Sequence, residues 1–359
     1  MKIITNYALK EFTKLFCFCL VAFIAIFLTV DFFEKVDRFA VAKVSTVTMI
    51  YFFLLKIPQI LVLMIPVAVL MGVMLCLGIM YRNNEITAMK SCGISMNQLA
   101  YPFLLVCLLC SLLSFSIDQK IVPHASEVVN RIWELQIEKK PAESFYLNEK
   151  IWFRGSNSIY NIQVYQKDKK VFEGVTIYFL DKDFNLVKRL DAKRAQWVDG
   201  KWLFHNGLIQ IKDTDGSFRT TRFSIELIDL PERPSDLEHV IKNSEEMTVA
   251  EISNYINKIK TEGYNATRYE VDLHAKIAFP LVSVILGLIG ISVALGKGNK
   301  GGLAGGIGIS ISFSFFYWVF FGFTVSMGYS GLLPPFLAAW LANITFGLFG
   351  IYLFMNIPQ

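Results

Sequence analysis

The chain has 359 residues, of which 54% are hydrophobic, and a formal net charge of +5. A mean hydropathy of +0.45 is too high for an ordinary soluble protein, so the composition indicates a membrane protein. The charge excess is modest and unevenly spread, and we expect no nucleic-acid partner. All six cysteines lie in or beside apolar segments, which excludes a disulfide framework for the long polar middle of the chain.

The apolar segments predict six membrane-spanning helices, three on each side of one polar insert. Residues 1–14 are expected to form a separate amphipathic helix on the membrane surface, because lysines alternate there with apolar side chains. The charged segment 31–44 is expected to follow the first span as a loop. The six spans are expected within residues 15–30, 57–81, 94–117, 277–296 and, as a pair broken near 327–335, 301–359. The chain therefore divides into the regions 1–117, 118–271 and 272–359.

The insert over 118–271 changes from helical to strand periodicity. After a polar helix, β-branched and aromatic segments follow at short intervals over about 143–230. Asp199-Gly200 and Asp215-Gly216 are hairpin signals between such segments. This pattern predicts an antiparallel β-sandwich or jelly roll inserted between the third and fourth spans, with connecting helices on either side.

A short polar segment, 81–96, separates the second span from the third. It predicts a small helix over 83–93, with Asn83 or Asn84 as its cap and Glu85 in its first turn, near the positive end of the helix dipole. Ile86 and Met89 share one face at i, i+3 spacing, with Lys90 beside them. Such a helix is either a plain connector or a contact point for a cytoplasmic partner, and we favour the partner.

The placement of lysine and arginine predicts the orientation in the membrane. At the termini and in the short connections between spans, the side that carries both termini and segment 81–96 has the larger number of these residues. They are Lys2, Lys10, Lys14, Arg82, Lys90, Lys297 and Lys300, against Lys35, Arg38 and Lys43 on the other side. Both termini are therefore expected in the cytoplasm, and the insert is expected on the opposite side of the membrane.

No catalytic constellation is present, and we expect neither a metal nor a cofactor in this chain. A phosphate-binding loop has four residues between two glycines, followed by Lys and then Ser or Thr. The most similar segment, 290–298, has five residues between Gly290 and Gly296, and Gly298 follows Lys297 where Ser or Thr is needed. The chain is therefore not expected to hydrolyse ATP.

Positive side chains from distant segments are expected at the outer rim of the membrane. Each alone is explained by anchoring at the interface, but as a ring they would suit the phosphates of an anionic lipid head group. The residues are Lys35, Arg38, Lys43, Lys56, Lys120, Arg131, Arg268 and Lys276.

The sequence resembles the LptF/LptG family of lipopolysaccharide export permeases along nearly its whole length. The matching motifs are VDFFEKVDRF after the first span, NNEITAMKSCGIS between the second and third, DAKRAQWVDGKWLF in the insert, and YEVDLHAKIAFPL before the fourth. Any one of them alone is weak, but together they are specific. The first motif is more similar to the LptG branch of the family.

The resemblance implies the permease subunit of an ATP-driven exporter in the inner membrane of a Gram-negative bacterium, with the β-jellyroll in the periplasm. The implied partners are an LptF-like permease, two copies of an LptB-like cytoplasmic ATPase that carry ATP and Mg²⁺, an LptC-like single-span protein and an LptA-like periplasmic bridge. The ATPase-coupling residues would be Glu85, Ile86, Met89 and Lys90. The lipopolysaccharide-binding residues would be Glu34, Lys35, Asp37, Arg38, Lys43 and Arg131.

Two other classes of function compete with the exporter. A membrane-anchored periplasmic scaffold or binding protein would need fewer spans than six. A proton-coupled carrier would need ionisable groups at mid-membrane, whereas the charged residues here cluster at the ends of the apolar segments.

Overall fold

The structure is a computed structural model of the whole chain, and a defined set of residues is described. These are residues 2–137, 151–154, 158–166, 171–181, 185–198, 201–213, 217–228, 230, 244–261, 265–296 and 302–357. The two predicted hairpin turns and the basic turn at 297–300 lie outside this set, as does the predicted start of the β region at 143.

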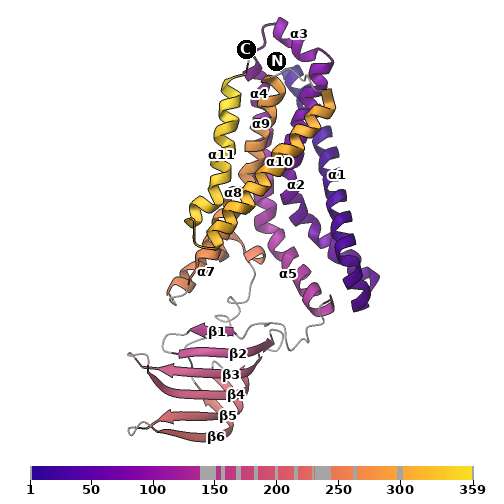
Figure 1. Cartoon of the computed structure of the whole chain (residues 1–359). Coiled ribbons are helices and arrows are strands. Elements are labelled where there is room, and N and C mark those ends of the chain that lie inside the picture. The colour runs from indigo at the N-terminus through magenta and orange to yellow at the C-terminus, as the bar shows by residue number, and fades with distance from the viewer. Residues whose placement is uncertain are drawn as a thin grey trace.

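The helices form one elongated bundle, and six of them are long and apolar enough to cross a membrane (Figure 1). They fall in two groups of three, before and after the β region, as the sequence predicts. The N-terminal helices are α1 (Lys2–Ala42), α2 (Thr46–Arg82), α3 (Glu85–Ser91), α4 (Met96–Lys120) and α5 (Val122–Ile132). The C-terminal helices are α7 (Val249–Thr261), α8 (Thr267–Ala278), α9 (Val282–Gly296), α10 (Gly302–Tyr329) and α11 (Pro335–Met355).

α2 is the central helix of the bundle. Of its most apolar 18-residue segment, 78% is buried inside the chain, against 11% for α1. Gly287 allows α9 to approach α2 and α4 closely, because a Cβ there would lie 3.1 Å from Cys107 Cβ and 3.2 Å from Val69 Cγ1. Cys107 and Cys110 are both buried and neither forms a disulfide.

The expectation of a separate surface helix over 1–14 and a loop over 31–44 is wrong. α1 runs without a break through 41 residues, from Lys2 to Ala42. The segment contains neither proline nor glycine, and buried Ala8, Phe12 and Phe39 anchor both of its ends to the rest of the chain. The charged residues after the apolar part of α1 are therefore helical and have fixed directions.

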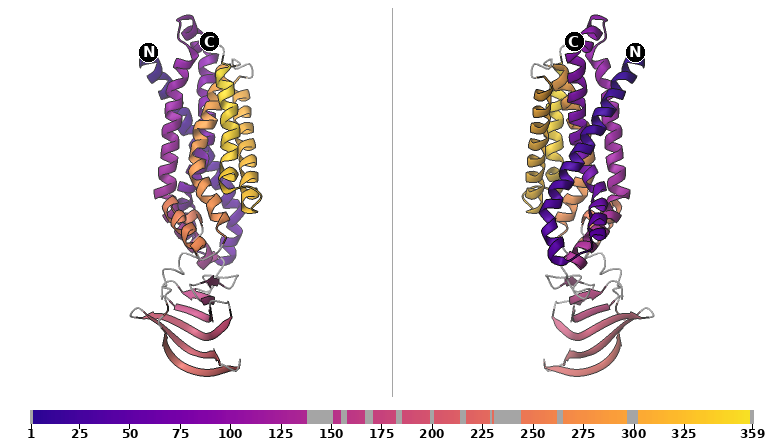
Figure 2. Two further views of the ribbon diagram at one scale, coloured as in Figure 1. Left: turned by 90° about the vertical axis from the view of Figure 1, so that its left-hand side faces the viewer. Right: turned by 90° about the vertical axis from the view of Figure 1, so that its right-hand side faces the viewer.

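The β region is a single antiparallel sheet of six strands paired in sequence order. Figure 2 shows that the sheet is strongly curved. The antiparallel insert is therefore confirmed, and its described strands form a meander, which the sequence pattern did not distinguish from the Greek-key order of a jelly roll. The strands are β1 (Ile151–Arg154), β2 (Ser158–Gln166), β3 (Val171–Leu180), β4 (Leu186–Val198), β5 (Lys201–Lys212) and β6 (Phe218–Ile228).

The sheet lies at one end of the bundle, and α3 and both chain termini lie at the other (Figure 1). β1 is the strand nearest the helices, and β6 is the farthest. On the bundle side, a π-helical turn at Trp133–Ile137 follows α5, and a 3-10 turn at Ser244–Glu246 precedes α7. Thr248 and Glu251 form a reciprocal capping box at the start of α7, with N–H to oxygen distances of 2.8 and 3.2 Å.

One buried polar network joins the last three spans. Tyr317 on α10 is fully buried and donates from its hydroxyl to Asn343 Oδ1 on α11 over 2.7 Å. Asn343 Nδ2 donates in turn to the carbonyl of Ala278, also over 2.7 Å. Ala278 ends α8 just before a 3-10 turn that contains Pro280, so the side chain of Asn343 satisfies a carbonyl at a helix break.

Candidate functional site

A buried acid on α1 joins two basic side chains near the sheet end of the bundle. Asp31 is 7% exposed and forms ion pairs with Lys35, one turn further along α1, and with Lys56 of α2. Lys56 Nζ lies 2.7 Å from Asp31 Oδ2, and the Lys35 and Lys56 side chains are only 21% and 14% exposed. One buried carboxylate faces two ammonium groups, so this ion-pair group has one more positive charge than negative charge, and an anion can balance it.

The Trp133 ring makes cation–π contacts with two basic side chains of α1. Arg38 Cζ lies 5.5 Å from the centre of the Trp133 ring, and Lys35 Nζ lies 5.9 Å from it. The Trp133 ring packs in turn against Phe39 and Phe52, at centroid distances of 6.4 and 5.9 Å. We call this group the basic cluster, and its members are Asp31, Lys35, Arg38, Lys56 and Trp133.

The π-helical turn that begins at Trp133 gives the indole its place in the basic cluster. π-helical turns are uncommon and frequently mark functional sites. α5 brings the turn beside α1 and α2, because Val129 and Ile132 pack with Phe39 and Phe52 in one apolar cluster. The site therefore combines three segments that are distant in sequence.

The structure separates the predicted lipid-binding residues into two groups. Lys35 and Arg38 lie in the basic cluster, whereas Glu34 and Asp37 are exposed carboxylates on α1, whose negative charge does not favour a phosphate. Lys43 is exposed just after α1, where its positive φ of 57° ends the helix. Arg131 is exposed on α5.

Three members of the basic cluster were not among the predicted binding residues. Lys56 was expected only in the general ring of positive charge, and nothing in its own segment indicates a partner on α1. The spacing of Asp31 and Lys35 at i, i+4 is a usable signal for their ion pair once the segment is known to be helical. Trp133 carries no signal in sequence, because its role depends on how α5 packs.

At the opposite end of the bundle, α3 presents Glu85 in its first turn. Tyr7 of α1 donates to Glu85 Oε1 over 3.3 Å, and Asn83 Nδ2 donates to the same oxygen over 3.2 Å. The other oxygen, Oε2, is buried without a hydrogen-bond partner among the described residues. An unsatisfied carboxylate oxygen is costly, so this position favours an incoming donor.

Two of the four predicted ATPase-coupling residues, Ile86 and Met89, lie on the inward face of α3. Ile86 is fully buried and packs in the main core, and Met89 is half-buried against the same core. These two residues attach α3 to the bundle. The outward face of α3 carries the small side chains of Thr87, Ala88 and Ser91, with Lys90 half-buried beside them.

α3 ends at Ser91, two residues before a glycine. Gly93 has a φ of +80°, and the N–H groups of Gly93 and Ile94 donate to the carbonyls of Lys90 and Met89 over 2.9 and 3.1 Å. This pairing is the Schellman arrangement, which only a residue tolerant of positive φ completes without strain. At the start of the helix Asn84 has a φ of 59° and makes no side-chain cap.

Together, the six apolar helices and the inserted sheet define a multi-pass membrane protein with a β domain between its third and fourth spans. The sequence model of the family described as lipopolysaccharide export system permease LptF/LptG matches residues 6–356. The chain therefore belongs to the LptF/LptG family of permeases.

Curated relatives agree with this assignment and are of the LptG type. The lipopolysaccharide export system permease protein LptG of Escherichia coli K12 is 22% identical over 324 residues, which are 84% of each chain. The LptG protein of Haemophilus influenzae is 21% identical over 247 residues, which are 68% of this chain and 67% of that relative.

Proposed function

We propose that this chain is the transmembrane permease subunit of an ATP-driven exporter, which extracts lipopolysaccharide from the inner membrane of a Gram-negative bacterium and passes it to a periplasmic bridge toward the outer membrane. One observation carries the proposal. The basic cluster lies near the sheet end of the helix bundle, whereas α3 lies at the other end with both termini (Figure 1). In this assignment α3 and the termini are cytoplasmic and the sheet is periplasmic.

The basic cluster is suited to the phosphates of a lipid head group. Lys35, Arg38 and Lys56 provide charged donors, and Asp31 holds two of them in place. An arriving phosphate is attracted by the surplus charge and binds through charge-assisted hydrogen bonds. Lys43, five residues after Arg38, and Arg131, two residues before Trp133, are exposed. They would extend the contact toward the outer surface of the membrane.

The ATPase subunits would bind at α3. Glu85 offers a carboxylate whose second oxygen lacks a hydrogen-bond partner, and the small side chains of Thr87, Ala88 and Ser91 leave room for close approach. Since Ile86 and Met89 fix α3 to the core, movement of α3 would carry the helix bundle with it. Two copies of an LptB-like subunit, one beneath each permease, would supply ATP hydrolysis.

A second, LptF-like permease would cover part of the exposed apolar surface of the bundle. α10 exposes 54–62% of the surface of each of four large apolar side chains, namely Phe315, Phe316, Val319 and Phe323. α1 likewise exposes Phe18, Val21, Ile26, Val30 and Phe33. An LptC-like single-span protein would dock near α1.

The outer edge of the sheet would meet the next component of the pathway. β6 is an edge strand, it is farthest from the bundle in Figure 1, and most of its side chains are exposed. Edge strands have unpaired main-chain groups that accept a further strand. An LptA-like bridge would add its own strand to this edge and continue the curved sheet.

Transport in this scheme is a rigid-body process. ATP binding closes the two ATPases, the α3 helices move inward, and the space between the two permeases narrows. Lipid is then forced toward the β domains and leaves by the bridge.

The test is purification of the full chain from bacterial membranes in mild detergent, with and without Glu85→Arg. An ATPase and lipopolysaccharide should co-purify with the wild-type chain. Glu85→Arg should lose the ATPase, because it places a cation where a carboxylate is needed to accept a hydrogen bond. Glu226→Arg on exposed β6 is the matched charge reversal outside α3 and should retain the ATPase.

The same experiment separates the exporter from the competing scaffold. A periplasmic scaffold would bring down periplasmic partners alone, and Glu85→Arg would change nothing. Absence of any ATPase from the wild-type preparation would contradict the exporter.

A further inference from the structure

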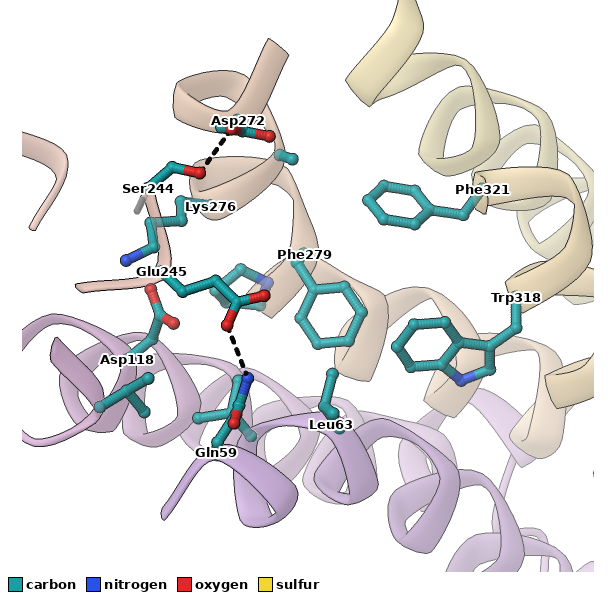
Figure 3. A pocket seen from close by; sticks show the side chains of 14 residues that line it. Gln59, Leu63, Asp118, Ser244, Glu245, Asp272, Lys276, Phe279, Trp318 and Phe321 are labelled. Atoms are coloured by element: carbon teal, nitrogen blue, oxygen red, sulfur yellow. Dashed lines mark hydrogen bonds between the residues drawn. The ribbon is translucent and has the colours of Figure 1, made fainter. Parts of the chain in front are cut away.

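A cavity of about 250 Å³ lies between α2, α4, α8 and α10, apart from the basic cluster. Gln59 and Leu63 of α2 and Asp118 near the end of α4 line it. It extends along the 3-10 turn between α8 and α9. Figure 3 shows that its lining is divided in two. Polar side chains gather on one side and aromatic ones on the other, which is the division that an amphiphile requires.

The polar side has a surplus of negative charge, because three carboxylates and one ammonium group line it. Asp272 is engaged, since its Oδ2 accepts from Ser244 over 2.6 Å and its Oδ1 accepts from the Tyr329 hydroxyl. The other lining charges are Asp118, Glu245 and Lys276.

Within the described part of the chain, the hydrogen bonds to the remaining two carboxylates come from neutral side-chain amides. Asp118 Oδ2 accepts from Gln119 over 3.0 Å, and Glu245 Oε2 accepts from Gln59 over a long 3.4 Å. Lys276 donates to the carbonyl of Met247. Lys276 is the single positive charge among the described lining residues, and it faces both acids. One ammonium group cannot balance two carboxylates, so the polar side has room for one further cation.

The largest side chains of the apolar side come from α2, α10 and the 3-10 turn at Phe279–Leu281. The ring of Phe279 lies 5.3 Å from that of Trp318 and 6.0 Å from that of Phe321, centre to centre. Leu63 of α2 closes this side in Figure 3. Such a wall excludes water and suits an acyl chain rather than a wholly polar ligand.

We propose that this pocket binds a zwitterionic phospholipid with a primary amine, of the phosphatidylethanolamine type. The ammonium group lies between Asp118 and Glu245, the phosphate faces Lys276, and the first part of one acyl chain lies against Phe279 and Trp318. The charge arrangement opposes an anionic lipid, so the site goes beyond the proposed export function and is a second lipid site, selective for a different head group.

The test uses the full chain, with the partners that purify with it, in mixed micelles of defined lipid. Phosphatidylethanolamine with brominated chains quenches a nearby indole, so Trp318 reports occupancy, and Trp318→Phe supplies the background from the other tryptophans. Quenching should saturate at a mole fraction about fivefold lower for phosphatidylethanolamine than for brominated phosphatidylcholine or phosphatidylglycerol. Equal saturation by all three would overturn the proposal.

Substitution tests which groups select the amine. The double change Asp118→Asn with Glu245→Gln should abolish the preference, whereas Glu226→Gln, a matched loss of a carboxylate on β6, should keep it. The N-methylated series from phosphatidylethanolamine to phosphatidylcholine tests the same point on the wild-type chain. Binding should weaken with each methyl group, and a flat series would contradict direct recognition of the ammonium group, however the variants fold.

Two competition measurements test whether the acyl chain is needed and whether this pocket is separate from the lipopolysaccharide site. Soluble glycerophosphoethanolamine should compete poorly, and equal competition would mean that the aromatic wall plays no part. Lipopolysaccharide should not displace the brominated lipid, and displacement would overturn the claim of a second site. Recovery of ATPase and lipopolysaccharide from the same samples tests the export function separately, so either result can fail while the other stands.

Discussion

Asp31 of α1 and Lys56 of α2 are 25 residues apart in sequence, and their charged atoms lie 2.7 Å apart in the structure. The same carboxylate also pairs with Lys35, so one buried acid positions two basic groups at the level where a lipid head group would arrive. The pair links the first two spans and the proposed lipid site in a single contact.

Replacing Lys56 tests whether the basic cluster binds lipid. Lys56→Gln should reduce the lipopolysaccharide recovered with the chain about tenfold, because a hydrogen bond to a charged group contributes about 1.5 kcal/mol. Lys14→Gln removes a lysine from the other end of α1, where Lys14 pairs with Glu11 and is 62% exposed, and should change nothing. Equal loss in both variants, measured by mass spectrometry of the bound lipid, would indicate a general charge effect.

Replacing Asp31 tests the counterion role by a double-mutant cycle. Asp31→Asn removes the carboxylate that both mostly buried ammonium groups share and should destabilise the chain by about 3 kcal/mol. Adding Lys56→Met should restore part of this loss, because the surplus charge is then removed. Additive effects of the two changes on the unfolding midpoint in detergent would show that the pair is not coupled.

Tyr317 and Asn343 provide a test of the buried network between the last spans. Tyr317→Phe removes the hydroxyl that donates to Asn343 and leaves a buried amide oxygen without a partner, which should cost about 1–2 kcal/mol. Tyr352→Phe, on α11 with the side chain 64% exposed, is the matched control. Thermal unfolding that shifts equally for both variants would contradict the network's contribution.

Much of the architecture follows from sequence, because apolar length and strand alternation are local properties. The six spans and the antiparallel insert were predicted from such patterns and are confirmed. The full length of α1 was not predicted. The lysines at its start resemble a separate surface helix, and the mixed charges at its end resemble a loop. Its continuity depends on tertiary burial of residues such as Phe12 and Phe39.

The candidate functional sites could be predicted from the sequence only in part. Lys35 and Glu85 were selected through their motifs, and the structure gives each of them specific contacts. The buried side of α3 and the contribution of Trp133 could not be predicted, because both depend on which neighbouring helix covers the residue. The amphipathic pocket joins residues from α2 to α10, a distance in sequence that no local pattern describes.

Gly287 tests the close packing of α9 against α4. Gly287→Ala would place a Cβ well within van der Waals contact of Cys107 Sγ, so the helices must move apart at a cost of about 1–3 kcal/mol. Gly322→Ala on α10 meets nothing within 4 Å and should be neutral or slightly stabilising. The comparison is made by unfolding in detergent, and an unchanged midpoint for Gly287→Ala would contradict the packing described.

The two faces of α3 should respond differently to substitution. Ala88→Trp adds bulk on the exposed face and should abolish ATPase recovery while leaving the unfolding midpoint of the chain unchanged, because nothing of the core is disturbed. Ile86→Ala, on the buried face, should lower that midpoint by removing about 2–4 kcal/mol of core packing, and the ATPase should still bind to the fraction that remains folded. Both quantities are measured on the same detergent-purified samples. If Ile86→Ala loses the ATPase at full stability while Ala88→Trp keeps it, the buried face is the one that meets the partner, and α3 must then turn away from the bundle before the ATPase binds.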